Sequence, residues 1–296
     1  MRYASAGAFR TALERRLLTL AQQTGVPLVR LRKLVAFDRL LARLVAVAPN
    51  RWVLKGAVAL HFRIGLQFRS TMDLDLGRHD DEQAATADFL LAQSVDLGDY
   101  FRFAIQRMSK LDALVEGAAV RYHVTAEVDR RPFEHVTVDV GFGNQPSLEP
   151  ELLRGPDLLS FADISPTEVP TLPLDQHVAE KVHAYTCGYA AGHSSSRTKD
   201  LIDLVLIASL FPFRADRLRS ALRATFDARG THPPPATLPP PPAGWGPAYR
   251  KLAAELGLQP EVSIGYQRAA AFLDPILGSA VSDAAQWDPV RRTWSP

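Results

Sequence analysis

Apolar residues recur at intervals of three or four through the N-terminal region and through most of the C-terminal half, and this spacing predicts helices. Between these regions apolar and polar residues alternate, which is the pattern of half-buried strands. The predicted helices are residues 8–24, 28–47, 57–64, 81–94, 174–190, 198–210, 215–228, 244–257 and 263–276. The predicted strands are residues 52–54, 73–75, 100–108, 119–128 and 136–140.

The order of these elements predicts an α+β fold, with a small mixed sheet flanked by helices and a helical C-terminal domain attached. Residues 144–173 contain several prolines and are expected to form a connecting loop region, so we place the domains at residues 1–150 and 151–296. The tract THPPPATLPPPP, residues 231–242, excludes helix and central strand and is expected to be an extended surface connector. The C-terminal end, about fifteen residues, is expected to be weakly ordered.

Composition excludes several classes of protein. The chain has 296 residues and a net charge of +2, and its single cysteine, Cys187, excludes an internal disulfide framework and a cysteine-based zinc site. The sequence contains no run of eighteen apolar residues, and the N-terminal MRYASAGAFR lacks the apolar segment of a secretory signal. We therefore expect no membrane span and a cytoplasmic location.

Basic residues are concentrated in the N-terminal third. Between residues 28 and 55, Asp38 is the lone acidic residue among Arg30, Arg32, Lys33, Arg39, Arg43, Arg51 and Lys55. A basic segment of this kind is able to hold a phosphate-rich polymer. A solvated helix surface explains the same pattern equally well.

Three aspartates are the strongest candidates for chemistry. Asp73 and Asp75 alternate with Leu74 and Leu76, so their carboxylates point to one face of the predicted strand, while Asp139 has the same kind of position on a later strand. If those strands are neighbours, the three carboxylates converge, and a divalent metal would then offset their repulsion. Hard oxygen ligands suit magnesium. An isolated Asp-x-Asp is more often a solvated surface feature, so the prediction depends on its surroundings.

The segment before these aspartates has the features of a phosphate site. Residues 53–57, VLKGA, read as a strand, a glycine turn and the start of a helix. A helix N-terminus offers backbone N–H groups and a positive dipole end to an anion, and Gly56 lets a triphosphate approach the backbone closely. A strand, a glycine turn, a helix and then Asp-x-Asp is the arrangement that nucleotidyl transfer to a hydroxyl needs.

Several motifs resemble those of the AbiEii/AbiGii toxins, which are nucleotidyltransferase-like proteins of bacterial toxin–antitoxin and phage-abortive-infection systems. The motifs are LKGAVALHFRIGLQFRSTMDLDL at residues 54–76, VDVGFG at 138–143, HVAEKVHAYT at 177–186 and RTKDLIDL at 197–204. The resemblance covers about residues 50–210, and it is greatest to mycobacterial members that modify transfer RNA. Where the family usually has Gly-Gly or Gly-Ser, this chain has Gly56-Ala57, so Ser70 or Thr71 would have to supply any hydroxyl to the triphosphate.

The resemblance implies roles for particular residues. Asp73, Asp75 and Asp139 would be catalytic and bind Mg²⁺, with Asp139 completing the metal shell or accepting the proton of the attacking hydroxyl. Lys181 and Asp200 would belong to the catalytic site, with Lys181 as a cation for the triphosphate. The implied nucleotide-binding residues are Lys55, Gly56, Ala57, Arg69, Ser70, Thr71 and Arg197.

Structural interpretations of the same residues stay open. Lys181 would otherwise lie along the core with its ammonium group in water, and Arg197 would form an ordinary helix-surface ion pair with Asp200. Arg69 would either neutralise phosphate or pair with Asp73 or Glu82. Asp203 is expected to be structural.

The implied function is an NTP-dependent nucleotidyltransferase toxin that adds NMP to the 3′ end of tRNA and so blocks aminoacylation and translation. The basic segment from Leu28 to Pro49, or the helical C-terminal half, would carry the RNA. A cognate antitoxin protein is a possible partner. Two alternatives remain: NMP transfer to a protein hydroxyl or a small molecule, and a catalytically silent module that binds an antitoxin or RNA.

Overall fold

The computed structural model describes residues 2–66, 68–71, 73–108, 118–143, 148–187 and 197–296. The chain divides into two compact units, the first formed by Met1–Gln145 and Pro150–Leu172 and the second by Pro146–Glu149 and Pro173–Pro296.

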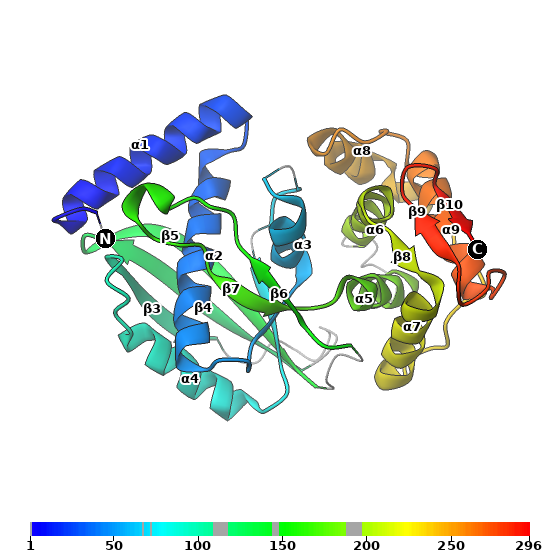
Figure 1. Cartoon of the computed structure of the whole chain (residues 1–296), viewed down its shortest axis with the longest axis horizontal. Coiled ribbons are helices and arrows are strands. Elements are labelled where there is room, and N and C mark those ends of the chain that lie inside the picture. Colours follow the sequence, from blue (N-terminus) through cyan, green and yellow to red (C-terminus); the bar gives the residue numbers. More distant parts are fainter. Residues whose placement is uncertain (1, 67, 72, 109–117, 144–147, 188–196) are drawn as a thin grey trace. The chain divides into compact units, whose positions relative to one another are not determined.

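A seven-stranded mixed sheet forms the centre of the first unit, with the strand order β3-β4-β5-β2-β1-β7-β6. Its strands are β1 (Val53–Lys55), β2 (Asp73–Arg78), β3 (Phe101–Arg107), β4 (Ala118–Val128), β5 (Arg131–Phe142), β6 (Glu151–Arg154) and β7 (Glu168–Thr171). The pairs β2–β5 and β1–β7 are parallel, and the other neighbours are antiparallel. The long β4–β5 hairpin is therefore joined to β1 and β7 through β2 (Figure 1).

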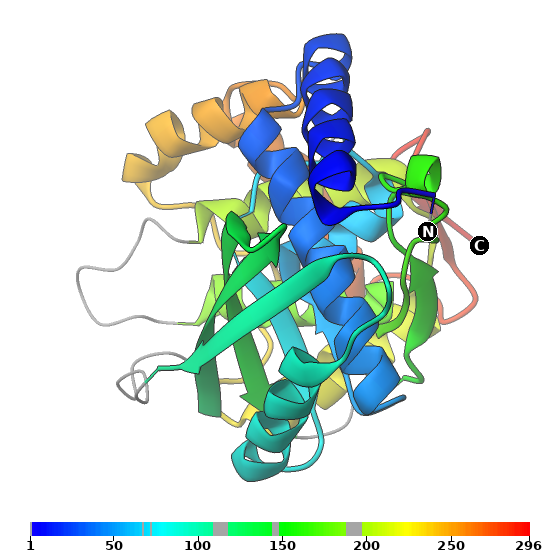
Figure 2. The same ribbon diagram turned by 90° about the vertical axis from the view of Figure 1, so that its left-hand side faces the viewer.

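The helices of this unit are α1 (Ala6–Thr24), α2 (Leu28–Val47), α3 (Gly56–Ile64) and α4 (Glu82–Ser94), with a short 3₁₀ turn at Ser160–Ala162. Local signals fix their ends: the hydroxyl of Ser5 accepts from the Ala8 N–H at the start of α1, and Gly25 ends that helix with a φ of +72°. At the start of α4, Asp81 Oδ1 accepts from the Ala84 N–H at 2.8 Å. Helix α2 crosses one face of the sheet (Figures 1 and 2).

The sheet buries one face and leaves polar side chains on the other. Leu74, Val138 and Val140 are fully buried in a core that also contains Leu34 and Phe37 of α2. Because successive side chains on a strand point to opposite faces, the residues between these apolar positions must lie on the other side of the sheet. This alternation is what presents the aspartates of β2 and β5.

Several basic residues of α2 form buried ion pairs and hydrogen bonds within the first unit. Arg43 is 1% exposed and forms paired bonds with Asp99 at 2.6 and 3.0 Å. Arg39 pairs with Asp38, and Lys33 donates to the carbonyl of His135 at 2.7 Å. Burial of these charges explains why both expectations for this segment, an RNA surface and a solvated helix face, were wrong for its central part. Removing one member of such a pair would leave the other charge buried, at a cost of about 3–5 kcal/mol.

Residues 151–172 depart from the expected division of the chain. The prolines suggested a connecting loop region, but β6 and β7 pair with each other, and β7 pairs with β1 through Leu54 and Thr171. The backbone groups of these short strands are satisfied within the sheet, so this segment belongs to the first unit. Pro170 lies inside β7, so the prolines of this segment did not exclude a strand.

The second unit is mainly helical. Its helices are α5 (Leu174–Thr186), α6 (Thr198–Leu210), α7 (Ala215–Arg229), α8 (Gly246–Glu255) and α9 (Val262–Leu277), with a 3₁₀ turn at Ala243–Trp245. Their bounds agree closely with the predicted helices, although the predicted end of the first, 188–190, lies outside the described residues. Residues 231–242 are neither helix nor strand, as expected.

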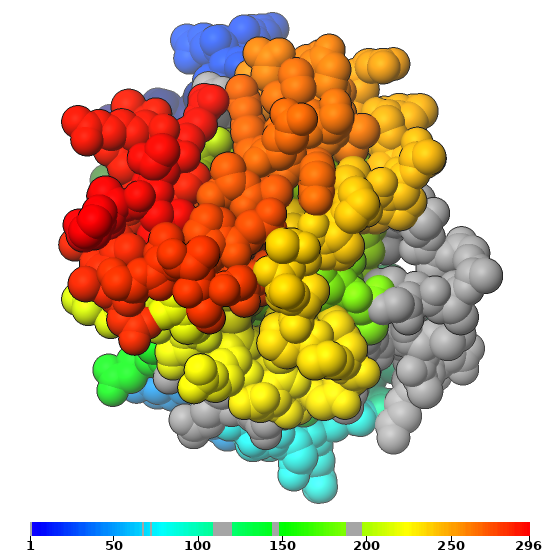
Figure 3. Space-filling view, turned by 90° about the vertical axis from the view of Figure 1, so that its right-hand side faces the viewer, coloured from blue at the N-terminus to red at the C-terminus, as the bar shows by residue number. Residues whose placement is uncertain are grey.

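The C-terminal segment is ordered, contrary to expectation. It forms β9 (Gln286–Asp288) and β10 (Thr293–Ser295), which join β8 (Phe213–Arg214) in a three-stranded sheet. The Trp287 indole donates to the Ala208 carbonyl at 2.7 Å and the Trp294 indole to the Phe272 carbonyl at 2.8 Å. Two tryptophans in a short polar sequence were the signal for this anchoring. Figure 3 shows these terminal residues packed beside α9 on the surface of the unit.

Within the described parts of the chain, we find no helix with both the length and the apolar character that crossing a bilayer requires.

Candidate active site

The strands that carry the three aspartates are neighbours. Strands β2 and β5 pair in parallel, with Asp75 opposite Asp139 and Asp73 opposite Thr137. Adjacent residues at the same register point to the same face of a sheet, and the three aspartates are half-buried on the face opposite the core. Met72, which was part of the sequence pattern, lies outside the described residues.

Arg121 completes this cluster, and the sequence analysis did not identify it. Strand β4 pairs with β5 so that Arg121 is opposite Asp139. Its guanidinium donates from Nε to Oδ1 and from a terminal nitrogen to Oδ2, both at 2.7 Å. These bonds raise the pKa of Arg121; burial opposes the rise, and the charges of Asp139, Asp73 and Asp75 add to it. The alternation on β4 indicated an outward position for Arg121, but only the register of β4 with β5 places it beside Asp139.

The three aspartates were predicted to bind a metal ion. Among the described residues, no group of three or more Asp, Glu, His or Cys side chains is placed to hold a metal ion. Each carboxylate oxygen of Asp139 accepts one hydrogen bond from Arg121, and the metal role of Asp139 stays a prediction. The oxygen donors of Asp73 and Asp75, side by side on β2, are of the type that magnesium prefers, and their metal role stays a prediction.

Gly56 brings the start of α3 against Asp75. Lys55 pairs with Asp75 in the β1–β2 register, and the chain enters α3 at the next residue. Gly56 has a φ of +62°, and a Cβ at this position would overlap Asp75 Oδ2 and lie 2.6 Å from Asp75 Cγ. Only glycine combines this backbone conformation with such a close approach. The positive end of α3 thereby lies beside a carboxylate of the candidate metal site.

The other predicted nucleotide-binding residues of the first unit follow Gly56 in α3 or precede β2. Ala57 is buried, and Ser70 is exposed. Arg69 is 6% exposed and its guanidinium lies over the Phe68 ring, 5.2 Å from the centroid. Thr71 donates its hydroxyl to the backbone carbonyl of Asp73 at 3.3 Å, so in this conformation it supports the strand. Their contacts with nucleotide stay predictions.

Lys181 and Asp200 lie together in the second unit. Lys181 Nζ on α5 is 3.2 Å from Asp200 Oδ1 and 2.6 Å from Asp203 Oδ2, both on α6. Arg197 also contacts Asp200, at 3.3 Å. Asp203 is fully buried, and its bond to Lys181 is the shorter one. The contact with Asp203 was not predicted: a spacing of three residues places Asp200 and Asp203 on one face of α6, but only the packing of α5 against α6 brings Lys181 to both.

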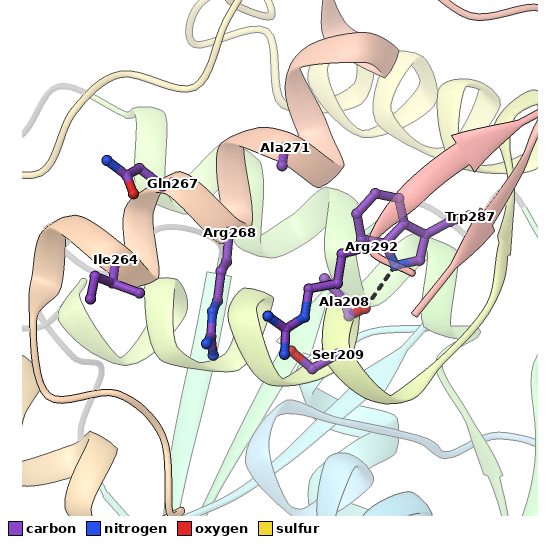
Figure 4. Close-up of a pocket in the computed structure, with 8 residues that line it drawn as sticks. All are labelled: Ala208, Ser209, Ile264, Gln267, Arg268, Ala271, Trp287 and Arg292. Atoms are coloured by element: carbon purple, nitrogen blue, oxygen red, sulfur yellow. Dashed lines mark hydrogen bonds between the residues drawn. The ribbon is translucent and has the colours of Figure 1, made fainter. Parts of the chain in front are cut away.

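The second unit also has a pocket of about 240 Å³ with two arginines at its edge. Arg268 on α9 and Arg292 between β9 and β10 both extend toward α6 (Figure 4). Ala208, Ala271 and Trp287 supply apolar surface. Within the described part of the chain, neither guanidinium forms an ion pair. The Ser209 hydroxyl donates to the Val205 carbonyl at 2.7 Å, which leaves its oxygen able to accept a hydrogen bond from a ligand.

Comparison with known proteins identifies the class to which this fold and site belong. The profile of the nucleotidyl transferase AbiEii toxins of type IV toxin–antitoxin systems matches residues 39–285. The chain therefore belongs to this family of nucleotidyltransferase enzymes. A search of curated protein sequences found no match.

Two of the solved structures that match the chain are those of MenT4, which has a similar fold, and JHP933. MenT4, a nucleotidyltransferase toxin from Mycobacterium tuberculosis H37Rv, is 22% identical with a TM-score of 0.56, over 92% of this chain and 99% of that one. JHP933 from Helicobacter pylori is 17% identical with a TM-score of 0.47, over 84% of this chain and 92% of that one. The α+β architecture with a seven-stranded mixed sheet is thus similar to that of a nucleotidyltransferase toxin.

Replacement of Gly56 by alanine tests the close approach to Asp75. We expect Gly56→Ala to lower the free energy of unfolding by about 1–2 kcal/mol for the positive φ and by about 1–3 kcal/mol more for the overlap with Asp75. We also expect nucleotidyl transfer to fall about 100-fold, because displacement of a catalytic group by about 1 Å has an effect of that size. Urea unfolding and transfer of labelled nucleotide measure the two effects.

Gly25→Ala is the matched control, because Gly25 has a φ of +72° and its Cβ would meet nothing within 4 Å. This variant should lose only the backbone part of the stability and keep full transfer activity. Equal losses of stability in the two variants, with activity retained in both, would contradict the proposed contact.

Proposed function

We propose that this toxin is a magnesium-dependent nucleotidyltransferase that moves NMP from an NTP to the 3′ end of tRNA. The observation that supports the reaction is the placement of Asp73 and Asp75 on one face of β2, with the Gly56 turn against Asp75. Oxygen ligands beside a helix N-terminus suit a metal–triphosphate substrate. The tRNA acceptor rests on the family resemblance, and on the RNA-binding features described below.

In the proposed mechanism the residues of the site either stabilise negative charge on the triphosphate or hold the reacting groups in position. The backbone N–H groups at the start of α3 and the side chain of Arg69 bind the triphosphate. The role of Lys181 as a further cation rests on the family resemblance alone. Asp73 and Asp75 would hold the magnesium, which would supply stabilisation of charge on the reacting phosphate. The 3′ hydroxyl oxygen of the acceptor forms a bond to the α-phosphorus as the bond to pyrophosphate breaks, and the hydroxyl proton passes to Asp139, the acceptor that the resemblance implies. Asp200 and Asp203 hold Lys181 in place.

The acceptor RNA is proposed to bind at the pocket beside α6 in the second unit. Arg268 and Arg292 would contact backbone phosphate, and the Ser209 oxygen would accept a hydrogen bond from a ribose 2′-hydroxyl. The buried ion pairs of Arg39 and Arg43 occupy two basic residues at the centre of α2, and this favours the second unit as the RNA surface. An added nucleotide at the tRNA 3′ end would block aminoacylation and so stop translation. An antitoxin is the partner expected for a toxin of this family.

The reaction is tested by incubating the protein with each α-labelled NTP, Mg²⁺ and total RNA or total protein. We expect label on tRNA, and we expect Asp73→Asn to lower transfer at least about 100-fold because it removes a metal ligand worth several kcal/mol in the transition state. Asp163→Asn is the control: Asp163 is exposed with a φ of +58°, which asparagine tolerates, so its rate should stay unchanged. Gel electrophoresis resolves the products.

The same experiment separates the alternatives. Label in the protein fraction or on a small molecule, with none on RNA, would replace the tRNA acceptor by another hydroxyl. Absence of any transfer, together with unchanged toxicity of Asp73→Asn in cells, would show a catalytically silent module that binds an antitoxin or RNA.

The RNA pocket is tested with the double variant Arg268→Gln/Arg292→Gln. We expect weaker tRNA binding, and we expect the slope of log affinity against log salt to become shallower by about 1.5, because about two phosphate contacts are lost. The Michaelis constant for NTP should not change. Arg291→Gln is the matched control, because Arg291 is a neighbour that pairs with Asp288 and does not line the pocket. Equal tRNA affinity in the double variant and the control would refute the proposed contact.

A further inference from the structure

We infer that Arg30 is a positioning residue that fixes the connection between α3 and β2, and thereby holds Arg69 where it is proposed to bind the triphosphate. This connection is described at residues 65–66 and 68–71. The inference rests on the proposed function, because Arg69 belongs to the triphosphate part of the same site. Arg30 lies in the first turn of α2, 36 residues before Leu66, so no local pattern in the sequence indicated its role.

Arg30 bonds to the backbone of the connection at two places. Its terminal nitrogen Nη2 donates to the Leu66 carbonyl at 2.9 Å and also to the Phe68 carbonyl. Neither residue belongs to a helix or a strand, so these bonds supply partners for carbonyl groups that regular structure does not satisfy. The Phe68 side chain is fully buried, and its packing fixes the same point of the chain. The connection is therefore held at Leu66 and Phe68 before it reaches β2.

His61, in the last turn of α3, accepts hydrogen bonds from the same guanidinium. Arg30 Nε lies 3.3 Å and Arg30 Nη2 lies 2.9 Å from His61 Nε2. Because an arginine side chain has only donors, Nε2 is the accepting nitrogen and the imidazole proton lies on Nδ1. The pKa of His61 is lowered to about 3, first by burial and then by the charge of Arg30. His61 is therefore neutral near pH 7 and remains an acceptor, so Arg30 joins the end of α3 to the connection that follows it.

Arg69 directly follows this anchored point. Its guanidinium lies 5.2 Å from the centroid of the Phe68 ring, and only 6% of the residue is exposed. The Phe68 ring in turn packs edge-on against the His61 ring, with 5.5 Å between the two centroids. Side chains packed in this way keep few alternative rotamers, so the loss of freedom that binding would otherwise impose on Arg69 is met by the fold. Arg30 thus acts on the triphosphate through Arg69 and needs no contact with phosphate itself.

The test is equilibrium binding of a fluorescent, non-hydrolysable NTP to the full chain in the presence of Mg²⁺. We expect Arg30→Gln to weaken NTP binding about tenfold, because Arg69 must then be ordered when the ligand binds. The KM for NTP should rise by the same factor, and the KM for tRNA should not change. Arg30→Lys should recover only part of the affinity, because an ammonium group lacks the planar fork that reaches both carbonyls and His61. Arg32→Gln is the matched control on the same helix: Arg32 pairs with Glu14, so NTP affinity should not change.

A double-mutant cycle separates this role from general support of the fold. Arg69→Gln should weaken NTP binding by about 10- to 100-fold, because it removes a charged hydrogen-bond donor to phosphate. The double variant Arg30→Gln/Arg69→Gln should match Arg69→Gln within about twofold, since residues that act through one contact are not additive. Circular dichroism confirms that each variant is folded, and Arg30→Lys takes the place of Arg30→Gln in the cycle if the latter is not.

Two outcomes would overturn the inference. If the losses of affinity in Arg30→Gln and Arg69→Gln multiply in the double variant, Arg30 acts independently of Arg69. Unchanged NTP affinity in both Arg30 variants would show that the connection does not need this anchor. Failure of the proposed function gives a different pattern, in which the wild type binds no NTP or Asp73→Asn transfers nucleotide at the wild-type rate.

Discussion

Parallel pairing between β2 and β5 is the interaction on which the candidate site depends. It sets Asp75 beside Asp139 at the same register, while the alternate residues Leu74 and Val138 are buried in the core. A shift by one residue would turn every aspartate into the core and every aliphatic residue out of it, so the apolar face enforces the register of the polar one. The Gly56 turn then adds a helix N-terminus to the same face.

The ion pairs of the first unit are of two kinds, buried and partly exposed. In α2, Arg39 and Arg43 form buried ion pairs with Asp38 and Asp99, where losing one partner is costly and the arrangement is fixed. On the open face of the sheet, Arg121 holds Asp139 in a partly exposed pair, where an exchange of partners costs less. The first kind is structural, and the second leaves a cluster that is able to respond to a cation.

The sequence predicted the elements well because periodicity records which face of each element is buried. It placed nearly all the helices and the Asp73–Asp75 strand, and its motifs identified the family. It missed the contacts that need long-range pairing: Arg121 opposite Asp139 depends on the β4–β5 register, and the Lys181–Asp203 bond depends on packing between α5 and α6. Residues 151–172 were misplaced because strand pairing, which local propensity does not show, overrides the prolines.

The most direct test of the account is a crystal structure of the protein soaked with Mn²⁺ and a non-hydrolysable NTP, with Mn²⁺ located by its anomalous scattering. The account predicts a peak at the carboxylates of Asp73 and Asp75, with the triphosphate at the Gly56 turn. A peak elsewhere, or no peak on this face of β2, would contradict the assignment of the active site.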